Sequence, residues 1–296
     1  MRSCNLAHLR LIAGVLGVFA ATSALAQSSG VVTTMELSPT QELLTDRFVI
    51  DLGAFIVSSK VNGSLRGDAN PNGGDRIDFD KVFGTDADAT RVRAAVLWRM
   101  TKRQSLRFAY FDDSVTRTRT IDQDINWGDY TFLANAAVTA RTKFSIYEAS
   151  YEFSFLNKPN YKVAVVAGVH VDDFSIGLAG DATVTLPDGT VQTGSYQSKN
   201  SSVTAPLPVL GLRGDWAVTD HIYLEGSAEV FKFSYEGIDG NWSVVWAGAS
   251  WMFSHHFGIG IAYDRFQTNV DLSKGSFNGR LNLGYQGAVL YIKGGF

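Results

Sequence analysis

The side chains with the clearest capacity for chemistry are His170 and the carboxylates placed near it. His170 and Asp172 are two positions apart, so both lie on one face of a β-strand. Glu148 should approach this pair from the neighbouring strand. A histidine held by carboxylates can activate a nucleophilic hydroxyl, and Ser175 is close in sequence. In a regular strand, however, Ser175 points to the opposite face, so we expect a buried histidine paired with a carboxylate rather than a catalytic group.

A second candidate site is the stretch from Asp68 to Asp75, which is rich in Asp, Asn and Gly. Its opening matches the D-x-N-x-N-G pattern of a calcium loop, in which Asp68, Asn70 and Asn72 would supply oxygen ligands. The twelfth position should be a bidentate Glu but is Phe79. The same residue types also form ordinary exposed turns. We therefore expect a solvated loop with calcium affinity no better than roughly 10⁻⁴–10⁻³ M, and neither a resident metal nor a cofactor.

The segments that would carry these residues alternate apolar and polar side chains with a period of two. After residue 47 no helix-period segment of useful length appears, and each alternating segment suits one tilted membrane-spanning strand. In the eighth segment both faces are apolar, which leaves its register ambiguous. The ten segments are residues 48–56, 92–100, 106–110, 147–155, 161–172, 208–216, 222–230, 244–253, 257–264 and 288–296.

The connections between these segments alternate in length. The tight turns are residues 101–104, 156–160, 217–220 and 254–256, and the long polar loops are residues 60–89, 117–138 and 179–204. Outer-membrane barrels keep short turns in the periplasm and long loops outside. With both termini periplasmic the strand number must be even, so we expect a single all-β, antiparallel transmembrane barrel of about ten strands. Eight would require merging segments, and twelve would require a hairpin at residues 126–137 and another hidden in the last strand.

This arrangement turns charges of both signs into the lumen. The predicted cations are Arg93, Arg99, Arg107, Lys162, Arg213 and Lys293, and the predicted anions are Asp51, Glu148, Glu152, Asp172, Asp215, Glu225, Glu229 and Asp264. In so narrow a barrel the interior is filled by side chains, and burying an unpaired charge there has a large desolvation free energy. We expect a network of salt bridges, with a narrow conduction path as the alternative.

The final strand resembles a known export feature. One register of residues 287–296 is apolar and ends the chain on an aromatic residue, Phe296, while Tyr291 and Lys293 lie on the other face. This pattern resembles the insertion signal of Gram-negative outer-membrane β-barrels. The resemblance implies that the barrel-assembly machinery of that membrane recognises the segment.

The start of the chain agrees with this location. Residues 1–26 hold two arginines, an apolar core too short to span a bilayer as a helix, and Ala24-Leu25-Ala26 before Gln27, which is typical of a secretory signal peptide. Cleavage would remove Cys4, the one cysteine, so thiol chemistry is not expected. We expect residues 27–46 to form a short periplasmic segment with a helical turn near residues 40–44, followed by the barrel at residues 47–296.

Further short segments resemble a loosely defined group of uncharacterised outer-membrane barrel proteins. They are IDFDKVFG at residues 77–84, Trp98-Arg99 with LRFAY at residues 106–110, and YQGAVLY at residues 285–291. Resemblance to that group implies a barrel fold, and it identifies no catalytic residue in this chain. The net charge of −3, which becomes −5 once Arg2 and Arg10 are removed, disfavours nucleic-acid binding.

The expected function is accordingly that of a monomeric outer-membrane protein in contact with lipids that include lipopolysaccharide. We expect a structural or surface-interaction role, or a narrow passive channel, without enzymatic chemistry of its own. The alternative is a lipid-modifying hydrolase that uses His170, although His221, His255 and His256 fall in the short turns and are expected to be solvated.

Overall fold

The computed structural model describes residues 36–69, 74–85, 89–235, 238–274 and 277–296. The expected signal peptide at residues 1–26, its cleavage site and residues 27–35 lie outside this part of the chain. Among the described residues, no helix has the length and apolar character needed to cross a bilayer.

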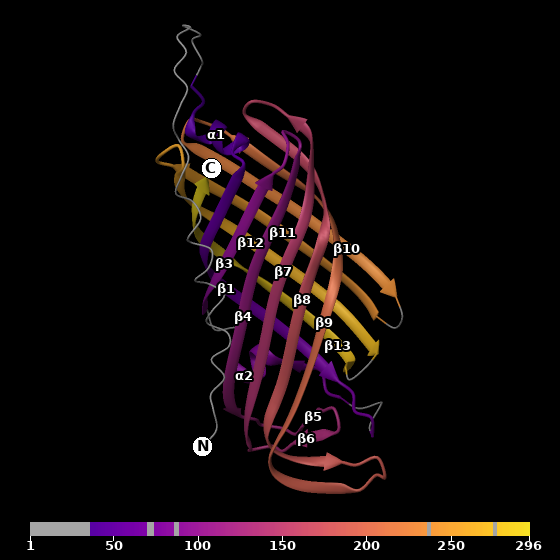
Figure 1. The fold of residues 1–296 in the computed structure, drawn as a ribbon. Helices are drawn as coiled ribbons and strands as arrows, with labels where there is room; N and C mark the ends of the chain where they lie inside the picture. The colour runs from indigo at the N-terminus through magenta and orange to yellow at the C-terminus, as the bar shows by residue number, and fades with distance from the viewer. Residues whose placement is uncertain (1–35, 70–73, 86–88, 236–237, 275–276) are drawn as a thin grey trace, which may run out of the picture. The chain divides into compact units, whose positions relative to one another are not determined.

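Across the described residues, ten antiparallel strands form a closed barrel (Figure 1). In order around the wall they are β1 (Phe48–Leu65), β3 (Ala89–Arg99), β4 (Gln104–Thr120), β7 (Ala137–Asn157), β8 (Tyr161–Thr185), β9 (Val191–Ala217), β10 (Ile222–Tyr235), β11 (Ile238–Met252), β12 (Phe257–Lys274) and β13 (Phe277–Gly295). Pairing of β13 with β1 closes the ring, and the last backbone contact joins Phe48 to Phe296. The predicted fold and strand number are confirmed.

Five short elements lie outside this ring. They are α1 (Pro39–Thr45), β2 (Ile77–Asp78), α2 (Phe79–Phe83), β5 (Ile125–Trp127) and β6 (Tyr130–Phe132). The hairpin considered for residues 126–137 exists in part, as β5 and β6, but it pairs with the outer end of β8 and adds no strand to the ring. The twelve-stranded alternative is therefore wrong.

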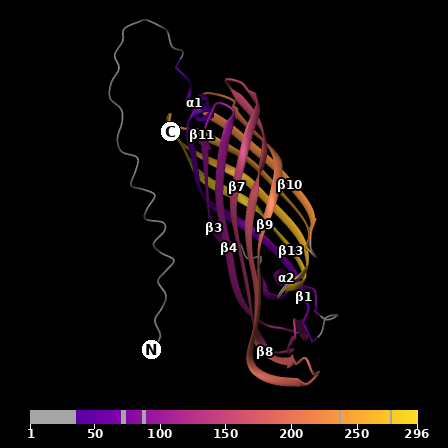
Figure 2. The same ribbon diagram turned by 45° about the vertical axis from the view of Figure 1, so that its right-hand side comes forward.

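Of the three predicted long loops, residues 179–204 are mostly strand, whereas long connections remain within residues 60–89 and 117–138 and are shortened where strands continue into them. β1 reaches Leu65, β4 reaches Thr120, and β8 and β9 occupy most of residues 179–204. Figure 2 shows the β8–β9 hairpin extending past the other strands, at the end of the barrel away from α1. Beyond the membrane both faces of a strand can be polar, so the alternation that identifies a spanning segment disappears while the backbone ladder continues.

The outward faces of the strands form an apolar belt. On β8 the belt runs from Tyr161 to Val171, and on β12 it runs from Phe257 to Tyr263. On β11 the ambiguous register is resolved, because Trp246 is buried in the lumen and Val245 is 44% exposed on the outer face. These exposed apolar side chains are what lipid would cover.

A row of polar side chains marks the outer edge of this belt. Asp112, Ser145, Asp173 and Thr204 are successive partners across β4, β7, β8 and β9. Ser145 donates a hydrogen bond to Asp112 at 2.6 Å, and Thr204 donates one to Asp173 at 3.2 Å. The hydrogen bonds satisfy these groups where lipid gives way to water.

At the opposite end, α1 lies across the mouth of the barrel. Ser38 caps its N-terminus in a capping box, and Pro39 begins the helix without requiring an amide partner. Leu43 and Leu44 are buried against a cluster of wall residues that includes Met252. This is the helical turn expected near residues 40–44, and the tight turns around it identify the end as periplasmic.

The belt predicts where a charge can be tolerated. Val165→Arg, at a lipid-facing position that is 45% exposed, should lower the free energy of unfolding by about 2–4 kcal/mol, because an arginine near the bilayer midplane loses its hydration. The matched change Val191→Arg, at a position 62% exposed on the outer extension of β9, should be nearly silent. Urea unfolding in lipid vesicles measures both. Equal effects of the two changes would show that the belt is misplaced.

Candidate functional site

The periplasmic half of the lumen contains a buried ion network centred on Lys293. This lysine is 1% exposed, and its ammonium lies 2.7 Å from Asp51 and 3.1 Å from Glu225. Arg213 contacts the other oxygen of Glu225 at 3.2 Å and also approaches Glu152 and Asp215. The network therefore crosses the lumen from β1 and β13 to β9 and β10.

Tyr291 adds neutral hydrogen bonds to this network. Its hydroxyl donates to Glu225 at 2.9 Å and lies 2.8 Å from the hydroxyl of Ser250. A Cβ atom at Gly260 would lie 2.3 Å from the Tyr291 ring, and one at Gly53 would lie 2.9 Å from the tyrosine Cβ. Glycine is required at both positions, because the Tyr291 ring occupies the space beside Gly260, and the Tyr291 Cβ and the Leu290 carbonyl occupy the space beside Gly53.

Halfway along the lumen, His170 lies among carboxylates. The histidine is 3% exposed, and its Nε2 atom is 3.9 Å from Glu148 and 3.7 Å from Glu229. Its ring also contacts Trp242 at a centroid distance of 4.5 Å. Arg107 pairs with Glu148 at 3.7 Å from the adjacent strand.

Above this level, six aromatic side chains fill the cross-section of the barrel. Phe144 and Phe174 stack at 4.6 Å, while Phe266 and Tyr285 stack at 5.1 Å. We call this set the aromatic layer; its members are Phe55, Phe111, Phe144, Phe174, Phe266 and Tyr285. Buried residues of α2, β5 and β6, including Phe79 and Trp127, continue this core toward the outer end.

Two of the predicted lumenal cations hold α1 instead of pairing with carboxylates. Lys162 donates to the carbonyl of Leu44 at 2.5 Å, and Arg99 donates to the carbonyl of Asp46 at 2.6 Å. The last carbonyls of a helix carry partial negative charge and lack partners within the helix, so cations are favourable there. The four other cations predicted to face the lumen have carboxylate partners, as expected; for Arg93 the partner is Asp264 at 3.2 Å.

The residues considered for hydrolytic chemistry are only partly brought together. His170 and Glu148 meet, and Asp172 is fully buried, but Ser175 lies on the outer face of β8 as the alternation predicts. Glu229, which completes the cluster, was predicted to face the lumen but not to reach His170. It comes from β10, which is separated from β8 by β9, and the curvature of the barrel wall brings the two side chains together in the lumen.

Half of the calcium-loop candidate, residues 70–73, lies outside the described residues. Of the carboxylates nearby, Asp75 accepts hydrogen bonds from Asn126, and Asp80 accepts them from Val61 and Thr85. Asp78 caps α2. These three groups fasten the segment to the barrel and to its own helix.

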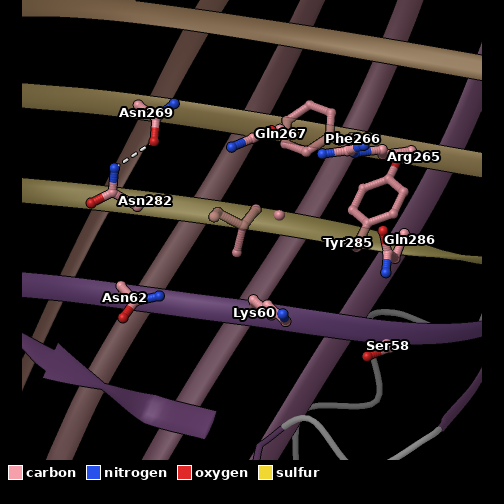
Figure 3. Close-up of a pocket in the computed structure, with 12 residues that line it drawn as sticks. Ser58, Lys60, Asn62, Arg265, Phe266, Gln267, Asn269, Asn282, Tyr285 and Gln286 are labelled. Atoms are coloured by element: carbon pink, nitrogen blue, oxygen red, sulfur yellow. Dashed lines mark hydrogen bonds between the residues drawn. The ribbon is translucent and has the colours of Figure 1, made fainter.

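A polar hollow of about 300 Å³ lies on the outer wall over β1, β12 and β13. Lys60 lies on the same face of β1 as the lipid-facing Ile56, and Arg265 lies on the same face of β12 as Ile261. Figure 3 shows Lys60 and Asn62 along β1, with Arg265 and the amides of β12 and β13 beside them. The hollow therefore begins where the apolar belt ends. Among the described residues, its polar lining consists mainly of amides and two cations and contains no carboxylate.

Comparison with known proteins supports the fold. No protein-family model matches the chain, and no curated protein is similar to it. The solved structure of the outer membrane protease OmpT from Escherichia coli is similar with a TM-score of 0.54 and 13% identity, covering 84% of this chain and 96% of that chain. The toluene transporter TodX of P. putida matches with a TM-score of 0.36 and 8% identity. That alignment covers 88% of this chain and 93% of the TodX chain.

The closed antiparallel ring with its apolar belt defines an integral membrane β-barrel. OmpT, an outer-membrane protein of Escherichia coli, has the same fold, which agrees with the outer-membrane location expected from the sequence. At 13% identity the likeness concerns the fold alone.

The ion network predicts a large cost for removing its central cation. Lys293→Met should lower the free energy of unfolding by about 3–5 kcal/mol, because Asp51 and Glu225 would remain buried without their counter-ion. Lys81→Met is a matched control, since Lys81 is 84% exposed and its pair with Asp78 is on the surface. Equilibrium unfolding in detergent micelles should show a change below about 0.5 kcal/mol for the control. A similarly small change for Lys293→Met would contradict the network.

The periplasmic helix predicts a pH dependence. Burial raises the pKa of the Asp46 carboxyl to about 6, although Arg99 opposes the shift. The folded protein then binds this proton more tightly than the unfolded chain, so the associated stability is complete near pH 4 and is lost as the pH rises through 6.

Asp46→Asn should therefore raise the free energy of unfolding at pH 7.5 by about 1 kcal/mol, allowing for solvent screening of this partly exposed group, and should change little at pH 4. The exposed Asp122→Asn serves as the control. Unfolding curves at the two pH values measure the difference. A gain for Asp46→Asn that was equal at both pH values would exclude titration of this carboxyl as the cause.

Proposed function

We propose that the protein is a closed, non-conducting outer-membrane barrel with a structural or surface-interaction role. The observation that carries this proposal is the filled lumen. From the periplasmic end outward, the lumen is filled by α1, the Lys293 network, the His170 level and the aromatic layer. Phe55 and Phe266 of the aromatic layer are 0% and 1% exposed. An ion would have to displace several of these layers in order to pass.

The outer wall supports the surface-interaction part of the proposal. Lys60 and Arg265 offer charge to phosphate groups, and the amides of Gln267, Asn269 and Asn282 offer hydrogen bonds to sugar hydroxyls. A hollow at the level where the belt ends meets the headgroups of the outer leaflet. We propose that it contacts lipopolysaccharide.

The proposal also covers catalysis, oligomeric state and insertion into the membrane. We infer that the protein has no hydrolytic activity of its own, which is supported by the burial of His170 and by the position of Ser175 on the other face of β8. We also propose that the chain works as a monomer. Its terminal Phe296 would be recognised by the barrel-assembly machinery during insertion.

Planar-bilayer recording tests the closed state. Purified protein should give no stable conductance steps, whereas a general diffusion porin in the same bilayers should give them. Regular steps from the purified protein, retained after a second chromatographic step, would replace this proposal with the passive channel.

Lipid binding is tested by exchanging the two cations of the hollow. Lys60→Glu combined with Arg265→Glu should reduce the lipopolysaccharide retained during purification, because phosphate would then meet like charge. Lys232→Glu, at an exposed lysine of β10 outside the hollow, should leave the amount unchanged. Native mass spectrometry counts the bound lipid. An equal loss in both proteins would mean that the hollow has no special role.

A further inference from the structure

We propose that Glu148, His170 and Glu229 bind one divalent transition-metal ion of the zinc class inside the barrel. The three residues come from β7, β8 and β10, and one potential ligand atom of each lies within 4.8 Å of the others. Their side chains are nearly or fully buried. This inference does not depend on the proposed surface role.

The spacing of the ligand atoms fits a shared ion better than direct hydrogen bonds. The Nε2 atom of His170 lies 3.9 Å from Glu148 and 3.7 Å from Glu229, and both distances exceed the limit of a hydrogen bond. Two ligands at about 2.1 Å from a tetrahedral zinc ion are about 3.4 Å apart. All three ligand atoms lie within 4.8 Å of one another, so inward movements of the flexible glutamate side chains by up to about 1 Å would complete the site.

Unpartnered polar atoms point to a missing ligand. Within the described structure, both ring nitrogens of His170 and one carboxylate oxygen of Glu229 are buried without a hydrogen bond. The side chains of His170 and Glu229 are 4% and 6% exposed. A cavity of about 30 Å³ adjoins Glu148 and His170, which is the space of about one water molecule or ion.

The surrounding charges favour a dication. Arg93 and Asp264 neutralise each other at 3.2 Å, which leaves Arg107 as the cation beside the cluster. Arg107 pairs with Glu148, and the carboxylates of the region also include Glu229 and Asp172, of which Asp172 is fully buried and lacks a hydrogen bond within the described structure. With a neutral imidazole, two negative charges remain in the centre of the barrel. A divalent ion would balance them.

The donor set restricts the kind of ion. One imidazole and two carboxylates suit zinc, manganese or ferrous iron, whereas calcium prefers six to eight oxygen ligands. The sequence alone predicts no metal here, because Glu229 lies far from His170 along the chain. A bound ion would join β7, β8 and β10 across the lumen.

The test uses untagged full-length protein refolded in detergent with zinc chloride and then freed of loose metal by gel filtration. Elemental analysis should find one zinc ion per chain. His170→Ala and Glu229→Gln should each lose it, while circular dichroism and heat-modifiable migration confirm that the barrels are folded. Cobalt substitution should add a visible ligand-field spectrum to the wild-type protein alone.

Surface histidines are the obvious competing ligands, so the control is the double variant His255→Ala with His256→Ala in the exposed β11–β12 turn. It should retain the zinc ion. The proposal is overturned if the wild-type protein contains no zinc, or if zinc is lost only in this control variant. If His170→Ala does not fold, the metal content of the wild type and the control variant still decides between these outcomes.

Discussion

The structure depends on one constraint, which is that lipid offers no hydrogen-bond partner to a backbone amide or carbonyl. A sheet that spans the membrane must therefore close on itself, as β13 does on β1. Closure fixes which side of every strand faces lipid, and alternate residues must then be apolar. The polar residues of each strand are confined to a lumen too narrow for water-filled space, so they must satisfy one another.

This confinement explains why the interior is organised in levels rather than as a continuous passage. Lys293 joins carboxylates from β1 and β10, and Arg93 joins β3 to Asp264 on β12. The pairs Lys293–Glu225 and Arg93–Asp264 link strands that are not neighbours, so they resist flattening of the barrel in a way that backbone ladders alone do not. Between these levels, bulky aromatic rings occupy the remaining cross-section.

Much of this architecture could be predicted because a period of two is a local property of the sequence. Facing, strand number and the identity of the lumenal charges follow from it directly. The outer extensions could not be predicted, since strands in water need no apolar face and their composition resembles that of loops. Contacts that depend on the three-dimensional arrangement of the strands could not be predicted either: Glu229 reaching His170, Lys162 reaching the end of α1, and Gly53 making room for Tyr291 all join segments far apart in sequence.

The uneven height of the apolar belt has a consequence for the surrounding bilayer. At roughly 3.3 Å per residue, the belt measures about 33 Å along β8 from Tyr161 to Val171 but about 20 Å along β12 from Phe257 to Tyr263. A strand tilt near 40° reduces these heights to about 25 and about 15 Å. Hydrophobic mismatch would then thin the membrane on the β12 side or tilt the whole barrel toward it. Either response lowers the lipid headgroups toward Lys60 and Arg265, so the shape of the wall itself would bring the outer leaflet to the hollow.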